Sequence, residues 1–333
     1  MREPLYRLLE GWLRHKSDMV NFEAARAICA MDNVTDKEVS PALQLLQLFL
    51  TSPRFIGRFT AIRILQNFAT THPHLVNSLN PDIEALISDT NRSIATYAIT
   101  TLLKTGNEAS VDRLMKEITG FMGSITDEFK VTIVEAIRSL SLKFPSKQGV
   151  MLGFLAGVLR DEGGFDFKQA VVEAMFDMIK YIPDCREEGS SIKDVTDVAL
   201  MHLCEFIEDC EYNNLAVRIL HLLGSEGPNT PKPSKYIRYI YNRVVLENAL
   251  VRAAAVTSLA KFGAGENVDP SVKASIKVLL TRCLDDPEDE VRDRAALNLK
   301  LLDNEQAANK FIKNGIIFLD HISRRFHVFS SST

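Results

Sequence analysis

The sequence predicts an all-α protein in which pairs of helices stack side by side into a solenoid, and three observations support this prediction. A short polar turn, a bulky apolar residue and then small or aliphatic residues at helical spacing recur eight times along the 333 residues. The copies follow one another at a nearly constant distance. Sustained alternation of apolar and polar residues, which is typical of a half-buried strand, does not occur.

The period of the repeat is about 36–40 residues. Successive anchor positions are separated by 36, 38, 36, 38, 48, 35 and 40 residues; they are Val20, Ile56, Ile94, Lys130, Lys168, Ala216, Val251 and Val291. Two helices of about four turns each, with their connecting turns, need this length. The period therefore indicates HEAT- or armadillo-like helix pairs. Tetratricopeptide repeats are shorter, about 34 residues, and their Trp–Leu–Gly pattern is missing, since Trp12 is the single tryptophan.

The clearest copy of the repeat lies in residues 284–303, where an acidic loop leads into a helix. Asp286 is expected to be the N-cap, with Pro287 at the first helical position. The following apolar residues fall on one face of a 3.6-residue helix; they are Val291, Ala295, Leu299 and Leu302. Such a face needs a neighbouring helix pair to cover it. Because no further copy follows, we expect this last face to be partly uncovered.

The domain organisation follows from the repeats. Residues 1–302 are expected to form the solenoid trunk, and residues 303–333 a C-terminal tail without a helix-pair pattern. The 48-residue step returns to the period if about 11 residues are removed, so residues 190–200 are predicted to be an insertion that loops out between helices; a splicing or gene-model artefact is the alternative. Residues 224–236, with three prolines and two glycines, are expected to be a longer connection.

Composition excludes several classes of protein. A net charge of −4 argues against a nucleic-acid binder that neutralises phosphates over a broad basic face. Five scattered cysteines indicate a reducing compartment. The first 16 residues hold no apolar stretch of the kind found in secretory signals, and the longest apolar run, residues 150–159, is about half the ~20 residues of a membrane span. We therefore expect a cytosolic protein whose membrane association is indirect.

Catalytic, cofactor and metal motifs are missing from the sequence, which predicts no enzyme, no cofactor and no metal. The nearest approach to a metal site is His202, Cys204 and Cys210. On a helix, however, His202 and Cys204 point about 200° apart, and Cys204 and Cys210 about 240° apart. An amphipathic helix with buried thiols explains these residues better.

Charged residues leave two interpretations open. Basic residues open many of the expected helices just after a turn; they are Arg54, Arg58, Arg92, Lys130, Lys168, Arg252 and Arg292. They either form ion pairs between neighbouring repeats or present a charged surface to a partner. The second interpretation requires apolar residues near the same turns, such as Phe55, Phe129 and Phe165, to be exposed together as a patch.

Longer stretches of the chain resemble the gamma-coatomer family, COPI coat proteins related to the large adaptins. The stretches that carry the resemblance are residues 88–116, 124–130, 160–167, 202–212, 215–228, 233–248, 260–264 and 290–295. They are distributed between residues 88 and 295, and residues 190–200 interrupt the family pattern. The resemblance implies a partial chain, an α-solenoid trunk without the linker and C-terminal appendage domain.

The same resemblance implies a function without catalysis. It predicts a structural and adaptor subunit of the COPI vesicle coat, a scaffold for protein interactions in Golgi-to-ER and intra-Golgi transport. The implied partners are other coatomer subunits, especially the zeta subunit, and an Arf-family GTPase whose binding surface we expect to be incomplete here. The implied location is the cytosolic face of Golgi membranes and coated vesicles. Another HEAT scaffold, for nuclear transport or phosphatase regulation, is the alternative, and the partner-contact residues stay open.

Overall fold

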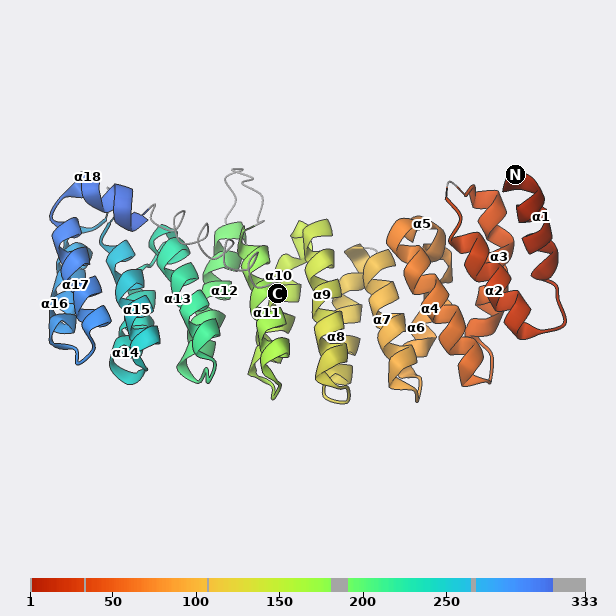
Figure 1. The fold of residues 1–333 in the computed structure, drawn as a ribbon, viewed down its shortest axis with the longest axis horizontal. Helices are drawn as coiled ribbons and strands as arrows, with labels where there is room; N and C mark the ends of the chain where they lie inside the picture. The colour runs from red at the N-terminus through yellow and green to blue at the C-terminus, as the bar shows by residue number, and fades with distance from the viewer. Residues whose placement is uncertain (1, 33, 107, 181–190, 265–267, 314–333) are drawn as a thin grey trace, which may run out of the picture. The chain divides into compact units, whose positions relative to one another are not determined.

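The structure is a computed structural model that describes residues 2–32, 34–106, 108–180, 191–264 and 268–313. It confirms the predicted fold class, because the regular structure of these residues is entirely helical. The chain divides into two compact units, residues 1–184 and 185–333. Within each unit the helices stand side by side in chain order (Figure 1).

The first unit is a stack of helix pairs. Its α-helices are α1 (Arg2–Trp12), α2 (Asp18–Cys29), α3 (Asp36–Leu50), α4 (Phe55–Thr71), α5 (Pro73–Val76), α6 (Asn80–Ala85), α7 (Arg92–Thr105), α8 (Val111–Met122), α9 (Asp127–Lys143), α10 (Gln148–Arg160) and α11 (Phe165–Lys180). Short 3₁₀ turns join some of them: η1 (Asn77–Leu79), η2 (Leu86–Ser88), η3 (Glu108–Ser110) and η4 (Pro145–Lys147). The second helices of successive pairs, α2, α4, α7, α9 and α11, pack against one another in a row.

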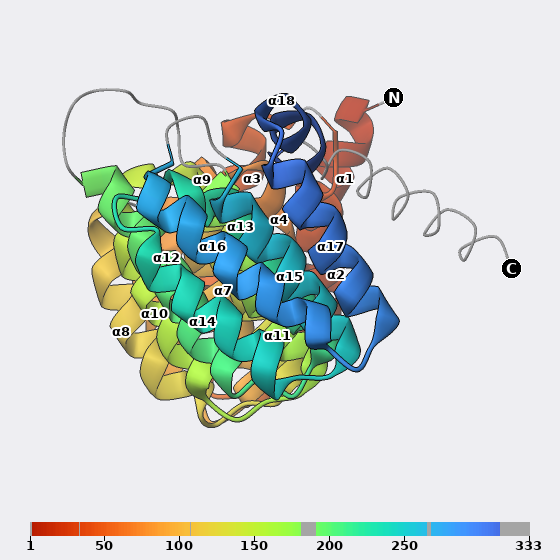
Figure 2. The same cartoon turned by 90° about the vertical axis from the view of Figure 1, so that its left-hand side faces the viewer.

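The second unit repeats this arrangement. Its elements are α12 (Ser191–Glu208), α13 (Asn213–Glu226), η5 (Gly227–Asn229), α14 (Ser234–Leu246), α15 (Ala249–Phe262), α16 (Pro270–Arg282), η6 (Cys283–Asp285), α17 (Asp289–Leu302), α18 (Glu305–Ala307) and a short π-helix, η7 (Ala308–Lys313). Helices α12, α14 and α16 form one layer, and α13, α15 and α17 form the other (Figure 2).

Small residues let the second helices of successive pairs pack closely against one another, as the repeat pattern predicts. Ala255 and Ala295, which follow the anchors of α15 and α17, are fully buried. Helix α15 lies against α13 so closely that a Cβ added at Gly224 would stand 3.0 Å from the Cα of Ser258. The Ser258 hydroxyl donates a hydrogen bond to the carbonyl of Leu220, 2.7 Å away, across the same contact. Glycine and alanine therefore set the distance between these helices.

The expected connection at residues 224–236 is shorter than predicted. Helix α13 continues through Gly224 to Glu226, and the connection to α14 is residues 227–233. The prediction was wrong because Gly224 interrupts no helix: it is buried, and its missing side chain makes room for α15. A glycine inside a helix costs about 1 kcal/mol relative to alanine, a cost that close packing offsets here.

The predicted loop at residues 190–200 is also corrected. Residue 190 lies outside the described residues, but residues 191–200 form the first turns of α12. Ala199 and Leu200 are buried, and the Tyr236 hydroxyl of α14 donates to the Asp197 carboxylate. Apolar residues at helical spacing thus hold this segment in the stack. Whether the long step in the period arose from an insertion stays a prediction.

Replacement of Tyr236 by phenylalanine tests this packing. We expect Tyr236→Phe to lower the free energy of unfolding by about 1.5 kcal/mol, because a hydrogen bond to a charged group is lost in a buried place. Urea unfolding measures the effect. Tyr239→Phe on the same helix, for which no hydrogen bond occurs among the described residues, is the control. Equal stability of the two variants would mean that residue 197 is not held against α14.

The helix of residues 284–303 begins later than predicted. Helix α17 starts at Asp289 and its N-cap is Glu288. Asp286 is not the N-cap, because it lies three residues before the start of α17, and its carboxylate accepts hydrogen bonds from Arg252 of the neighbouring repeat and from the Glu288 backbone N–H. The predicted apolar face is largely correct: Val291, Ala295 and Leu302 are buried and Leu299 is half-buried.

The end of the second unit differs from the expected tail. Residues 305–313 form α18 and η7, which pack against α17 and α15. Ala308 and Ile312 are buried there, so the last apolar face is covered rather than left open. The rest of the predicted tail, from residue 314, lies outside the described residues. In the described parts of the chain, no helix is long and apolar enough to cross a membrane.

Candidate interaction surfaces

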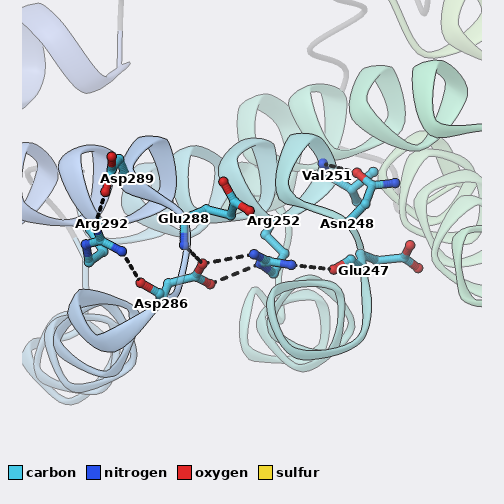
Figure 3. Close-up of polar contacts among 8 residues, drawn as sticks. All are labelled: Glu247, Asn248, Val251, Arg252, Asp286, Glu288, Asp289 and Arg292. Carbon is cyan, nitrogen blue, oxygen red and sulfur yellow. Dashed lines mark hydrogen bonds and ion pairs between the residues drawn. The ribbon is translucent and has the colours of Figure 1, made fainter.

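Polar contacts between neighbouring repeats occupy the turns that precede the second helices. In the second unit, the Arg252 guanidinium binds the Asp286 carboxylate through two hydrogen bonds, of 2.9 and 3.0 Å, from one turn to the next (Figure 3). Arg252 also donates to the carbonyl of Glu247, 2.8 Å away. Arg292 donates in the same way to the carbonyl of Asp286, 2.5 Å away. Each arginine thus closes its own turn, and Arg252 also joins two repeats.

The first unit contains the same device. Arg58 donates to the Asp89 carboxylate, 2.7 Å away, and to the carbonyls of Ser52 and Pro53. Both charged side chains are largely buried. Burial opposes ionisation of Asp89, but hydrogen bonds from Arg58 and from the Asn91 backbone outweigh it and lower its pKa. For Arg58 and Arg252 the structure therefore favours ion pairs between repeats over a charged partner surface.

The two lysines among these basic residues have other surroundings. Lys168 is buried and donates to the carbonyls of Leu159 and Asp161, which closes the turn before α11. Lys130 pairs with Asp127, and the Asp127 carboxylate accepts the Gly164 backbone N–H at 2.7 Å. That hydrogen bond, more than the Lys130 contact, lowers the pKa of Asp127. These lysines also serve the turns between helices.

We call the two ion pairs between repeats, Arg58–Asp89 and Arg252–Asp286, the ion-pair ladder. The sequence did not indicate its acidic members. Asp286 was predicted to be an N-cap and Asp89 was not singled out, yet each carboxylate accepts a hydrogen bond from the arginine of the preceding repeat. A signal was present: Asp89 follows Arg58 by 31 residues, and Asp286 follows Arg252 by 34 residues. A turn aspartate placed just under one period after an arginine predicts such a pair.

The three phenylalanines proposed as a joint patch are not exposed together. Phe55 is exposed, Phe165 is at the margin of exposure, and Phe129 is half-buried. Between the turns of Phe55 and Phe129 lies the start of α7, where Ile94 is fully buried. The edge of the first unit thus holds separate apolar sites rather than one continuous stripe.

An open apolar groove of about 740 Å³ lies between α8 and α10. Its α10 wall is low, because Gly153 and Gly157 leave open space where a side chain would stand. The remaining lining residues are Asp112, Met115, Lys116, Thr119, Val150, Phe154, Val158 and Asp161. A groove of this kind suits an interaction surface, but its lining brings together no nucleophile and base.

The residues considered for a metal do not converge. Cys204 is buried in α12, where burial raises the pKa of its thiol. His202 is half-buried with Glu205 3.5 Å away, and Cys210 lies beyond the helix end with its thiol 3.6 Å from the carbonyl of Tyr212. Within the described ranges, no group of three or more His, Cys, Asp and Glu residues is placed to hold a metal ion.

Comparison with known proteins identifies related chains. The family model of the adaptin N-terminal region matches residues 1–306. The chain is 55% identical over 313 residues to a probable coatomer subunit gamma of Schizosaccharomyces pombe, covering 94% of this chain and 33% of the relative. It is 58% identical to coatomer subunit gamma of Arabidopsis thaliana, covering 90% and 32%, and 52% identical to human coatomer subunit gamma-2, covering 94% and 35%. The chain thus spans about a third of the length of these relatives.

Solved structures show the same fold at low identity. A homology model of the full-length AP-3 complex contains a chain that matches with a TM-score of 0.65 and 13% identity, over 98% of this chain and 63% of that one. The karyopherin Kap121p, bound to the extreme C-terminus of the phosphatase Cdc14p, matches with a TM-score of 0.61 and 17% identity, over 91% and 34%. At such identities the likeness concerns the solenoid alone.

Proposed function

This chain belongs to the family of the adaptin N-terminal region. We propose that it forms part of the α-solenoid trunk of a COPI coat subunit. In this proposal it is a scaffold that carries out no catalysis and serves Golgi-to-ER and intra-Golgi vesicle transport. The observation that supports it most is identity of 52–58% to coatomer gamma subunits of a plant, a yeast and an animal. The alternative of a nuclear-transport scaffold has only a fold-level likeness behind it, 17% identity to a karyopherin.

The proposed mechanism is positional. Stacked repeats joined by ion pairs such as Arg252–Asp286 hold surfaces of one unit at fixed spacing. The open groove between α8 and α10 and the exposed turns offer sites for other proteins. We propose the zeta subunit and other coatomer subunits as partners, and an Arf-family GTPase as the recruiting factor. The proposed location is the cytosolic face of Golgi membranes.

Co-expression with the zeta subunit tests the proposal. We expect the chain and the zeta subunit to elute as one complex from a sizing column. The matched control is the small subunit of a clathrin adaptor, which we expect to elute separately. A folded chain, with the helical circular dichroism of the structure, that elutes apart from the zeta subunit would contradict a coat scaffold made by this chain alone. Retention of GTP-loaded but not GDP-loaded Arf on the immobilised chain tests the second partner.

A further inference from the structure

Three consecutive turns of the first unit lie side by side at one edge. They precede α2, α4 and α7, and the second and third are joined by the Arg58–Asp89 ion pair. The first two approach through Arg54 and Asp18, whose charged groups are 3.8 Å apart. Figure 1 shows these turns on the lower edge of the unit. Side chains on neighbouring turns can therefore act together on one ligand surface.

Apolar side chains project from the first two of these turns. Met19 is 67% exposed, Phe55 56% and Ile56 58%. Ile94 occupies the same repeat position in the third turn as Ile56 does in the second, and it is fully buried. The exposure of Ile56 is therefore not a general property of this repeat position. Large apolar side chains exposed close together mark a surface that is covered in function.

The same turns are cationic, although the whole chain has a net charge of −4. Residues 13–19, 51–58 and 89–94 contain five arginines or lysines and two aspartates. Both aspartates face arginines in ion pairs. Arg14, Lys16 and Arg54 are exposed. The next two turns of the unit, residues 123–130 and 161–168, contain more acidic than basic residues, so the positive charge is confined to the end that carries the apolar side chains.

We propose that this turn patch, formed by Arg14, Lys16, Met19, Arg54, Phe55 and Ile56, binds the surface of an anionic lipid bilayer. Phe55, Ile56 and Met19 enter the boundary between headgroups and acyl chains, and the three cations contact lipid phosphates and carboxylates. Cations interleaved with apolar tips on protruding turns match a bilayer surface, which presents anions above hydrocarbon. The inference deepens the proposed coat function, on which it rests for its membrane setting.

Sedimentation with vesicles of pure lipid tests the inference, since it requires no coat subunit. The full chain is mixed with vesicles of phosphatidylcholine alone or with about one third phosphatidylserine. We expect binding to the anionic vesicles only, weakening as salt increases. Trp12 is the single tryptophan, is 45% exposed and directly precedes the first turn. Its fluorescence is expected to shift to shorter wavelength on binding.

Two double variants separate the contributions of the patch. Arg14→Glu with Lys16→Glu, and Phe55→Ser with Ile56→Ser, are each expected to weaken binding about tenfold or more. Lys37→Glu and Leu142→Ser, exposed residues at the other ends of the helices, are the matched controls and are expected to bind as the parent chain does. Circular dichroism confirms folding of each variant.

Three results would overturn the inference. The first is the absence of binding to anionic vesicles by the folded chain. The second is binding that the patch variants leave unchanged, or that only the charge variant weakens. The third is loss of complex formation with the zeta subunit in the patch variants while vesicle binding is kept, which would assign the patch to a protein partner. Failure of zeta binding by the parent chain, with vesicle binding intact, would count against the coat function and not against the lipid surface.

Discussion

Replacement of Asp286 by alanine is expected to lower the free energy of unfolding of the second unit by about 3 kcal/mol. The Arg252 side chain is 15% exposed and that of Asp286 is 9% exposed, so loss of the carboxylate leaves a mostly buried guanidinium charge without its partner. The variant also removes the acceptor of the Glu288 backbone N–H, which lies 3.0 Å from the Asp286 carboxylate. Urea unfolding measures the loss, and amide hydrogen exchange in α15 and α17 locates it.

Two comparisons isolate the ion pair. Asp303→Ala, which removes the exposed ion pair between Lys277 and Asp303, is expected to cost less than about 0.5 kcal/mol. The double variant Arg252→Met with Asp286→Leu is expected to be more stable than Asp286→Ala, because no unpaired charge remains buried. If Asp286→Ala and Asp303→Ala unfold at the same urea concentration, the ladder does not hold the repeats together.

The features that could be predicted from the sequence are those that depend on local spacing. Alanines and leucines at helical intervals placed Val291 and Ala295 correctly on the buried face of α17, because helix periodicity is fixed by residues within one or two turns. The period also gave the order of the helix pairs. The 52–58% identity to coatomer gamma subunits agrees with the family resemblance read from motifs.

The features that escaped prediction depend on residues distant in the sequence. Aspartate is a common N-cap residue, which is why Asp286 was predicted to be one. Its carboxylate instead pairs with Arg252, which lies 34 residues earlier in the sequence. Gly224 has the appearance of a helix end, and only the approach of Ser258 gives it a place inside α13. The start of α12 deviates from the period, but Tyr236 and buried Leu200 hold it in the stack. The exposure of Phe55 beside Arg54 likewise depends on how neighbouring helix pairs pack, and the spacing of apolar residues in the sequence did not predict it.

Replacement of Lys261 by methionine is expected to raise the free energy of unfolding at pH 7 by about 2 kcal/mol. Lys261 is 7% exposed, and among the described residues its ammonium group has no hydrogen-bond partner. Burial lowers its pKa to about 8. At pH 7 the folded protein therefore holds a buried, unpaired charge, which is destabilising relative to an apolar side chain of similar length.

The pH dependence of this gain distinguishes charge burial from packing. The unfolded chain has a lysine pKa of about 10.4, above the folded value of about 8, so between these pH values the unfolded state binds more protons and the stability of the parent chain rises with pH. The advantage of Lys261→Met is thus greatest below pH 8 and shrinks toward pH 10. Lys300→Met, at an exposed position of α17, is the control and is expected to change stability little at any pH. A Lys261→Met advantage that stays constant from pH 7 to pH 10, or a loss at pH 7, would show that the amine is not a buried charge in the folded protein.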